Sequence, residues 1–94
     1  MAENLIRYFG TATGRVQGVG FRMFVQQHAI ELGVTGWVRN MEDGSVTMEL
    51  QGTQAQIDAL SNAIRKGNFF IRVKTFSLED RPLVTDESGF KIRY

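Results

Sequence analysis

Residues 5–33 decide the fold, and they read LIRYFGTATGRVQGVGFRMFVQQHAIELG. The first part, Leu5–Thr13, is rich in β-branched and aromatic residues and stops at a glycine, which predicts a strand. Arg15–Gly20 follows as a glycine-rich loop. From Phe21 onward apolar residues recur at the spacing of a helix with one buried face; they are Phe21, Phe24, Val25, Ala29 and Leu32. The helix ends at Gly33, where a C-terminal residue must adopt a positive φ.

The next stretch predicts a β-hairpin. Two β-patterned runs, Thr35–Met41 and Ser45–Gln51, flank a short turn that contains Asp43-Gly44. Asp-Gly between two such runs is typical of a turn that joins antiparallel strands. The second run alternates apolar with polar residues, so we expect one of its faces to be buried.

A second helix follows the hairpin. Thr53 and Gln56 have the spacing of a capping box, in which each side chain bonds the backbone N–H of the other residue. The apolar residues behind this start, Ile57, Leu60 and Ile64, share one helical face. Cations suit the last turn because of the helix dipole. Arg65 and Lys66 occupy that turn, and Gly67 stops the helix.

The C-terminal third predicts two further strands. Phe69–Leu78 is the first, with a slip in its alternation near Thr75-Phe76 that indicates a bulge. Arg81–Ser88 is a loop, and Phe90, Ile92 and Tyr94 alternate in a short last strand. The fold class is α+β: a ferredoxin-like split βαβ (β-α-β-β-α-β plus the C-terminal strand), with a mostly antiparallel sheet and two helices on one face. We expect residues 1–94 to form a single domain.

Composition narrows the class of protein. The 94 residues include no Cys and carry a net charge of +1, which fits a reducing compartment, and Met1–Asn4 shows no signal-peptide pattern. We therefore expect a cytoplasmic protein, and a monomer because no interaction segment is evident. Lys and Arg are spread along the chain, and no apolar run reaches the length of a membrane span. We expect neither a nucleic-acid nor a membrane partner.

The start of the first helix lacks a capping side chain. No Ser, Thr, Asp or Asn precedes it, since the chain reads Gly18-Val19-Gly20-Phe21-Arg22. Free N–H groups and the helix dipole favour an anion there, and the Arg22 guanidinium can bind two phosphate oxygens. The glycines can equally be turn chemistry alone. The loop matches neither a Walker A motif nor the dinucleotide-binding pattern, so nucleotide-binding folds are disfavoured.

Two motifs resemble the signatures of the acylphosphatase family. Gly14-Arg15-Val16-Gln17-Gly18-Val19-Gly20-Phe21-Arg22 is similar to the first, Gly-x-Val-Gln-Gly-Val-x-Phe-Arg. Gly36-Trp37-Val38-Arg39-Asn40, with Asp43-Gly44 and Val46 after it, is similar to the second. The resemblance spans nearly the whole chain and favours the anion site over a plain turn. It implies hydrolysis of a carboxyl-phosphate anhydride to a carboxylate and inorganic phosphate, with no metal and no cofactor.

The resemblance also assigns roles to residues. Arg22 and the loop would hold the phosphoryl group, and Asn40 would orient the attacking water. The phosphate-binding set is Arg15, Val16, Gln17, Gly18, Val19, Gly20 and Arg22. The small-molecule acyl phosphate is the substrate, and inorganic phosphate is the product and a competing ligand. Because a carboxylate leaving group has a conjugate-acid pKa of about 4, it departs without a general acid.

Two further residues and two alternative functions fit other interpretations of the sequence. A lone histidine, His28, favours packing over catalysis or metal binding, and Trp37 favours a place in the core. Two alternative functions stay open. One is an RNA-binding module, since RNA-recognition domains share the ferredoxin-like element order and stack bases on an open sheet face. The other is a regulatory domain that binds a phosphorylated ligand without significant turnover.

Overall fold

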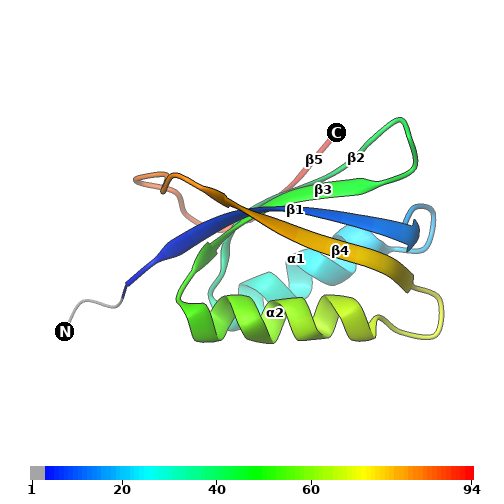
Figure 1. Cartoon of the computed structure of the whole chain (residues 1–94), viewed down its shortest axis with the longest axis horizontal. Helices are drawn as coiled ribbons and strands as arrows, with labels where there is room; N and C mark the ends of the chain where they lie inside the picture. The colour runs from blue at the N-terminus through cyan, green and yellow to red at the C-terminus, as the bar shows by residue number, and fades with distance from the viewer. Residues whose placement is uncertain (1–3) are drawn as a thin grey trace.

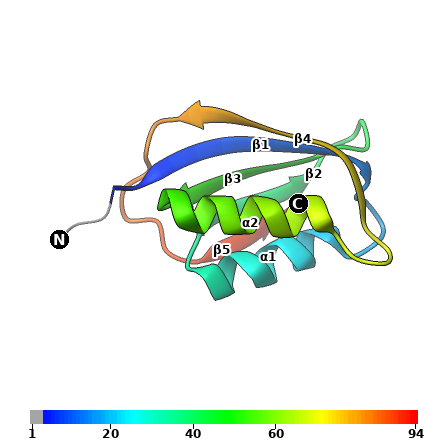
Figure 2. The same cartoon turned by 60° about the horizontal axis from the view of Figure 1, so that its bottom comes forward.

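The computed structural model describes residues 4–94. Its strands form one sheet in the order β4-β1-β3-β2-β5, and Figures 1 and 2 show both helices on one face of it. This is the predicted ferredoxin-like arrangement. In chain order the elements are β1 (Ile6–Arg15), α1 (Phe21–Leu32), β2 (Thr35–Asn40), β3 (Val46–Gly52), α2 (Gln54–Lys66), β4 (Arg72–Arg81) and β5 (Phe90–Arg93).

The core lies between the sheet and the two helices. Successive residues of a strand point to opposite faces, and in β3 the fully buried Val46, Met48 and Leu50 face the helices. The helical faces predicted from apolar spacing pack onto them. Those buried helical residues are Phe21, Val25 and Ala29 of α1 and Ile57, Leu60 and Ile64 of α2.

The last strand makes the sheet mixed rather than wholly antiparallel. β5 pairs in parallel with β2, with Gly36 opposite Phe90 and Val38 opposite Ile92. All other strand pairs are antiparallel. The parallel pairing carries the C-terminal end of the chain to the end of β2, beside Asn40. The alternation predicted Tyr94 within the last strand, but β5 ends at Arg93 and Tyr94 follows it.

The predicted start of β4 was wrong. The strand runs over Arg72–Arg81, whereas Phe69 and Phe70 lie in a bend and are exposed. Their bend is held by the Asn68 side chain, whose Oδ1 accepts hydrogen bonds from the backbone N–H groups of Phe70 and Ile71. An aromatic pair is typical of strands, but an Asn before it can bond the backbone locally and delay the strand.

A bulge lies where β4 meets the end of β1. Thr13 pairs with Thr75 and Gly14 pairs with Val73, so Lys74 is the extra residue. The bulge therefore lies at Lys74, one residue before the Thr75-Phe76 position predicted from the alternation. Beyond the bulge the pairing continues, which adds Arg15 to β1 instead of to the loop.

Trp37 does not lie in the core, contrary to the prediction. It is half-buried on the sheet face that points away from the helices. There its ring meets that of Phe9 edge-on, with centroids 6.3 Å apart. The reason is register: Val38, its neighbour in β2, takes the inward position and is fully buried.

Candidate active site

The start of α1 leaves its amides without internal partners. Gly20, the residue before the helix, adopts the left-handed region at φ 77°, and no side chain caps the first turn. Gly18 has φ 74°. A Cβ at either glycine would meet no atom within 4 Å, so the backbone conformation rather than crowding calls for glycine here. Within residues 4–94, the amides of residues 17–20 donate to no backbone carbonyl. The helix therefore begins with a turn of open N–H groups.

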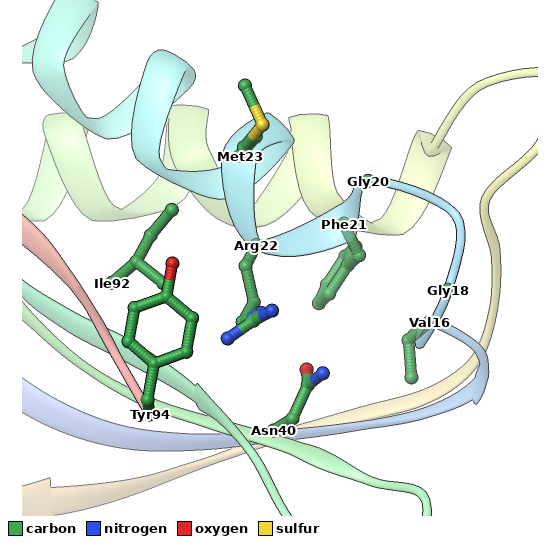
Figure 3. A pocket seen from close by; sticks show the side chains of 9 residues that line it. All are labelled: Val16, Gly18, Gly20, Phe21, Arg22, Met23, Asn40, Ile92 and Tyr94. Carbon is green, nitrogen blue, oxygen red and sulfur yellow. The ribbon is translucent and has the colours of Figure 1, made fainter.

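A pocket of about 200 Å³ opens in front of this helix start. Figure 3 shows the Arg22 guanidinium entering it from α1 and the Asn40 amide entering it from the end of β2. Three residues of the preceding loop contribute to its wall. The lining residues are Val16, Gly18, Gly20, Phe21, Arg22, Met23, Asn40, Ile92 and Tyr94.

Asn40 presents an unpaired acceptor to this pocket. Its Oδ1 is buried and has no hydrogen-bond partner among residues 4–94. A buried polar atom without a partner costs free energy, so it is usually satisfied by water or by a ligand. Asn40 is the last residue of β2, and this places its side chain at the edge where the sheet meets the start of α1.

The turn after Asn40 is fixed by hydrogen bonds of its own. Asp43 Oδ1 accepts from both the backbone N–H and the hydroxyl of Ser45. These two bonds lower the pKa of the Asp43 carboxyl below its usual value. The Met41 N–H donates to the Ser45 carbonyl at 2.9 Å. Asp43 therefore serves the Asp-Gly turn, as the sequence predicted, and keeps the end of β2 in place.

Gln17 fastens the loop to this hairpin. Its Nε2 donates to the backbone carbonyls of Met41 and Ser45, each at 2.8 Å. The side chain thus joins the two segments that carry the open amides and Asn40. Sequence reasoning placed Gln17 in the loop but gave its side chain no role, because its partners lie 24 and 28 positions away.

Arg22 is positioned by the C-terminal end of the chain. Its guanidinium carbon lies 4.8 Å from the centre of the Tyr94 ring, a cation–π distance. Its Nη1 lies 3.5 Å from the Arg93 carbonyl oxygen, a long contact. Among residues 4–94 its guanidinium makes no other hydrogen bond, so most of its donors can bind another partner. Three of the lining residues were not predicted, because no sequence signal linked them to the site; they are Tyr94, Met23 and Ile92.

The predicted site residues are not all equivalent in the structure. Val16, Gly18, Gly20, Arg22 and Asn40 line the pocket together. Arg15, Gln17 and Val19 do not line it: Arg15 ends β1 and is exposed, and Val19 packs against the core. His28 also lies elsewhere, against the Phe24 ring with centroids 4.4 Å apart. No Asp, Glu, His or Cys of residues 4–94 is among the lining residues. The arrangement favours binding of an anion, with one amide side chain available to a neutral molecule.

Comparison with known proteins identifies the family of this chain. The family model described as acylphosphatase matches residues 8–92. The chain belongs to the acylphosphatase family. The acylphosphatase of Clostridium beijerinckii is 41% identical over 90 residues, which cover 96% of this chain and 100% of that one. The acylphosphatase of Geobacillus kaustophilus is 44% identical over 81 residues, 86% of each chain.

The same family appears among solved structures. The crystal structure of acylphosphatase from Bacillus subtilis superimposes with a TM-score of 0.89 at 34% identity, covering 95% of this chain and 99% of that one. As a member of the acylphosphatase family, the chain is an acyl phosphate hydrolase. Within residues 4–94, no helix is long and apolar enough to cross a membrane.

Proposed function

We propose that this acylphosphatase binds the phosphoryl group of an acyl phosphate with Arg22 and the loop amides, and that Asn40 positions the attacking water. One observation carries the proposal. The start of α1 and Asn40 line the same pocket, and neither the first helical amides nor Asn40 Oδ1 has a capping or hydrogen-bonding side chain among residues 4–94. The start of α1 favours an anion, which the phosphoryl group supplies. Asn40 Oδ1 can accept a hydrogen bond, which the attacking water supplies.

The binding step follows from the charge of the phosphoryl group. Open N–H groups and the positive end of the α1 dipole attract its oxygens. The Arg22 guanidinium adds a planar pair of donors that matches two phosphate oxygens. Because phosphoryl transfer has a loose transition state with charge on these oxygens, the donors that bind the substrate also stabilise the transition state.

Asn40 acts on the nucleophile. A water molecule that donates one hydrogen to Asn40 Oδ1 keeps a lone pair free to attack phosphorus. The new bond forms between water oxygen and phosphorus while the bond from phosphorus to the acyl oxygen breaks. The electron pair of the broken bond leaves with the carboxylate. The water proton passes to a phosphoryl oxygen, since no lining side chain offers a base. The products are the carboxylate and inorganic phosphate.

The leaving group explains why the site can lack an acid. A carboxylate whose conjugate acid has a pKa of about 4 departs unprotonated, whereas an alkoxide from a phosphate monoester needs a proton. The proposed site therefore discriminates by leaving group. It hydrolyses acyl phosphates and leaves ordinary monoesters intact.

Hydrolysis in ¹⁸O-labelled water tests this mechanism. We expect the label in inorganic phosphate and none in the carboxylate, because water attacks phosphorus. An alkyl phosphate monoester serves as the comparison substrate, and we expect its kcat/KM to be lower by about 1000-fold or more, the range that general acid catalysis supplies. Label in the carboxylate, or comparable kcat/KM values for the two substrates, would contradict the proposed chemistry.

A further inference from the structure

The sheet face that points away from the helices carries features that the hydrolytic site does not use. Figure 1 shows both helices below the sheet and no helix above it. Alternate residues of all five strands point to this open face. The pocket with Arg22 and Asn40 belongs to the helix side, because Phe21 and Ile92 of its lining pack with the core.

Positive charge gathers on the open face. Among the outward strand residues, six are exposed cations; they are Arg15, Arg39, Arg72, Arg81, Lys91 and Arg93. The outward strand residues include two acids, Glu49 and Glu79. Glu49 and Glu87 both pair with the buried Arg7, so this cluster of one cation and two carboxylates is net negative. Glu79 lies 3.4 Å from Arg81. The remaining cations have no acidic partner within 4.0 Å in the described chain.

Two aromatic residues lie in the middle of this face, one on each side of Glu49 in β3. Phe9 of β1 and Trp37 of β2 meet edge-on at 6.3 Å. Arg81 lies over the Phe9 ring at 4.9 Å, and Arg93 lies over the Trp37 ring at the same distance. Each of the two rings therefore has a guanidinium over it. Flat rings and guanidinium planes both stack on nucleic-acid bases.

We propose that the open face binds single-stranded RNA. The cations pair with backbone phosphates, and bases stack on Trp37 and Phe9 beside their arginines. Hydroxyl side chains lie between the basic positions. Thr75 and Ser77 of β4 are exposed, and Thr11 and Thr13 of β1 are half-buried. These hydroxyls are suited to contacts with the 2′-hydroxyl, the group that distinguishes RNA from DNA.

The fold explains why the sequence predicted no nucleic-acid partner. Along the chain the cations are scattered, and this favoured a protein without a nucleic-acid partner. Strand alternation then places Arg39 beside Arg93 across β2 and β5, and Arg15 opposite Arg72 across β1 and β4. Like charges directly opposite each other on a sheet are unfavourable, so a polyanion that binds there relieves their repulsion.

Titration with a fluorescein-labelled oligouridylate of about 15 nucleotides tests the proposal. Anisotropy reports binding, and the single Trp of the chain, Trp37, reports stacking through quenching of its fluorescence. We expect both signals with the same midpoint. Raising salt from about 50 to about 200 mM should weaken binding roughly 50-fold if about four phosphates are neutralised. At constant ionic strength, saturating inorganic phosphate, the proposed ligand of the hydrolytic pocket, should leave the affinity unchanged.

Matched variants locate the surface. Lys91→Ala removes a cation from the open face, and Lys66→Ala removes one from the last turn of α2, on the other layer. We expect Lys91→Ala to weaken binding several-fold and Lys66→Ala to have no effect. Trp37→Leu should weaken binding about tenfold or more through lost stacking. All three should keep acyl phosphate hydrolysis, which serves as the control for folding.

Several outcomes would overturn the proposal. They are no saturable binding at low salt, binding without Trp quenching, equal losses in Lys91→Ala and Lys66→Ala, or displacement by inorganic phosphate at constant ionic strength. A DNA oligonucleotide of the same length serves as a second probe, and equal affinity for it would overturn the choice of RNA. None of these results depends on the hydrolytic mechanism, so the two proposals fail separately.

Discussion

The two helices of this acylphosphatase start in opposite ways. At α2, Thr53 Oγ1 accepts from the Gln56 N–H at 3.2 Å, and Gln56 Oε1 accepts from the Thr53 N–H at 2.8 Å. At α1, Gly20 contributes no side chain and the first turn is uncapped. Both helices are preceded by a glycine-containing segment and packed on the same sheet face. The difference lies in what satisfies the first amides: the protein itself at α2, and a ligand at α1.

This contrast separates stability from function along one chain. A helix cap contributes about 1 kcal/mol to stability, and α1 forgoes that contribution at the place where its amides face the pocket. Asn40 adds a second unsatisfied group at the same place. Unpaired groups that converge on a pocket indicate a site where binding, rather than folding, supplies the missing bonds. Substitutions at the two helix starts should therefore differ in kind.

Arg22→Ala should have the largest effect. The guanidinium neutralises charge on the transferring phosphoryl group, so we expect kcat/KM for an acyl phosphate to fall by about 1000-fold or more. Arg65→Ala is the matched control on α2, since Arg65 also contacts a carbonyl and an aromatic ring, those of Phe76. It should retain full activity. Steady-state kinetics with far-UV circular dichroism checks both. A loss in Arg65→Ala as large as that in Arg22→Ala would show that the effect comes from packing.

Asn40→Ala should come next, with a kcat lower by about 100- to 1000-fold, the loss for one positioned group acting on the transition state. KM should stay the same, because Asn40 contacts the water and not the phosphoryl group. Stability should not fall, since the substitution removes a buried acceptor that has no partner among residues 4–94, a group that costs about 1–3 kcal/mol. Kinetics and urea unfolding measure the two quantities. If KM rises while kcat stays, the assigned role is wrong.

The elements that the sequence predicted well depend on local spacing. The capping box at Thr53 and Gln56 forms as expected, because both of its bonds span three residues. The buried face of α2 follows from the helical period of Ile57, Leu60 and Ile64. The hairpin after α1 follows from Asp43-Gly44, and the structure shows Asp43 bonded to Ser45 within that turn. Each of these features is decided within a few positions along the chain.

What the sequence missed depends on contacts between distant segments. β5 joins the sheet beside β2 and brings Tyr94 to Arg22, and nothing near Tyr94 in the chain specifies that edge. Gln17 donates to the carbonyls of Met41 and Ser45, which belong to the distant hairpin turn. Trp37 lies outward because register gives the inward position to Val38. Family resemblance supplied Asn40, whereas its unpaired Oδ1 became visible only in the folded chain.

Inorganic phosphate should stabilise the wild-type protein through the start of α1. A ligand that binds only the folded state adds about 2.7 kcal/mol at 100 times its dissociation constant, which appears as a rise in the melting temperature. The increase should be largely lost in Arg22→Ala and retained in Thr53→Ala. Sulfate, a second tetrahedral anion, should also stabilise the wild type. A phosphate-dependent rise of equal size in Arg22→Ala would place the bound anion away from α1.

Thr53→Ala should have the smallest effect, and this effect should be on stability and not on activity. It removes the hydroxyl that accepts from the Gln56 N–H, so we expect a loss of about 1 kcal/mol in the free energy of unfolding, measured in urea. Thr85→Ala, at an exposed threonine of the loop before β5, should change it by less than about 0.5 kcal/mol. Neither variant should alter kcat or KM, because neither Thr53 nor Thr85 lines the pocket. A lower kcat in Thr53→Ala would mean that the start of α2 also supports the site. The two helix starts would then no longer divide stability from function.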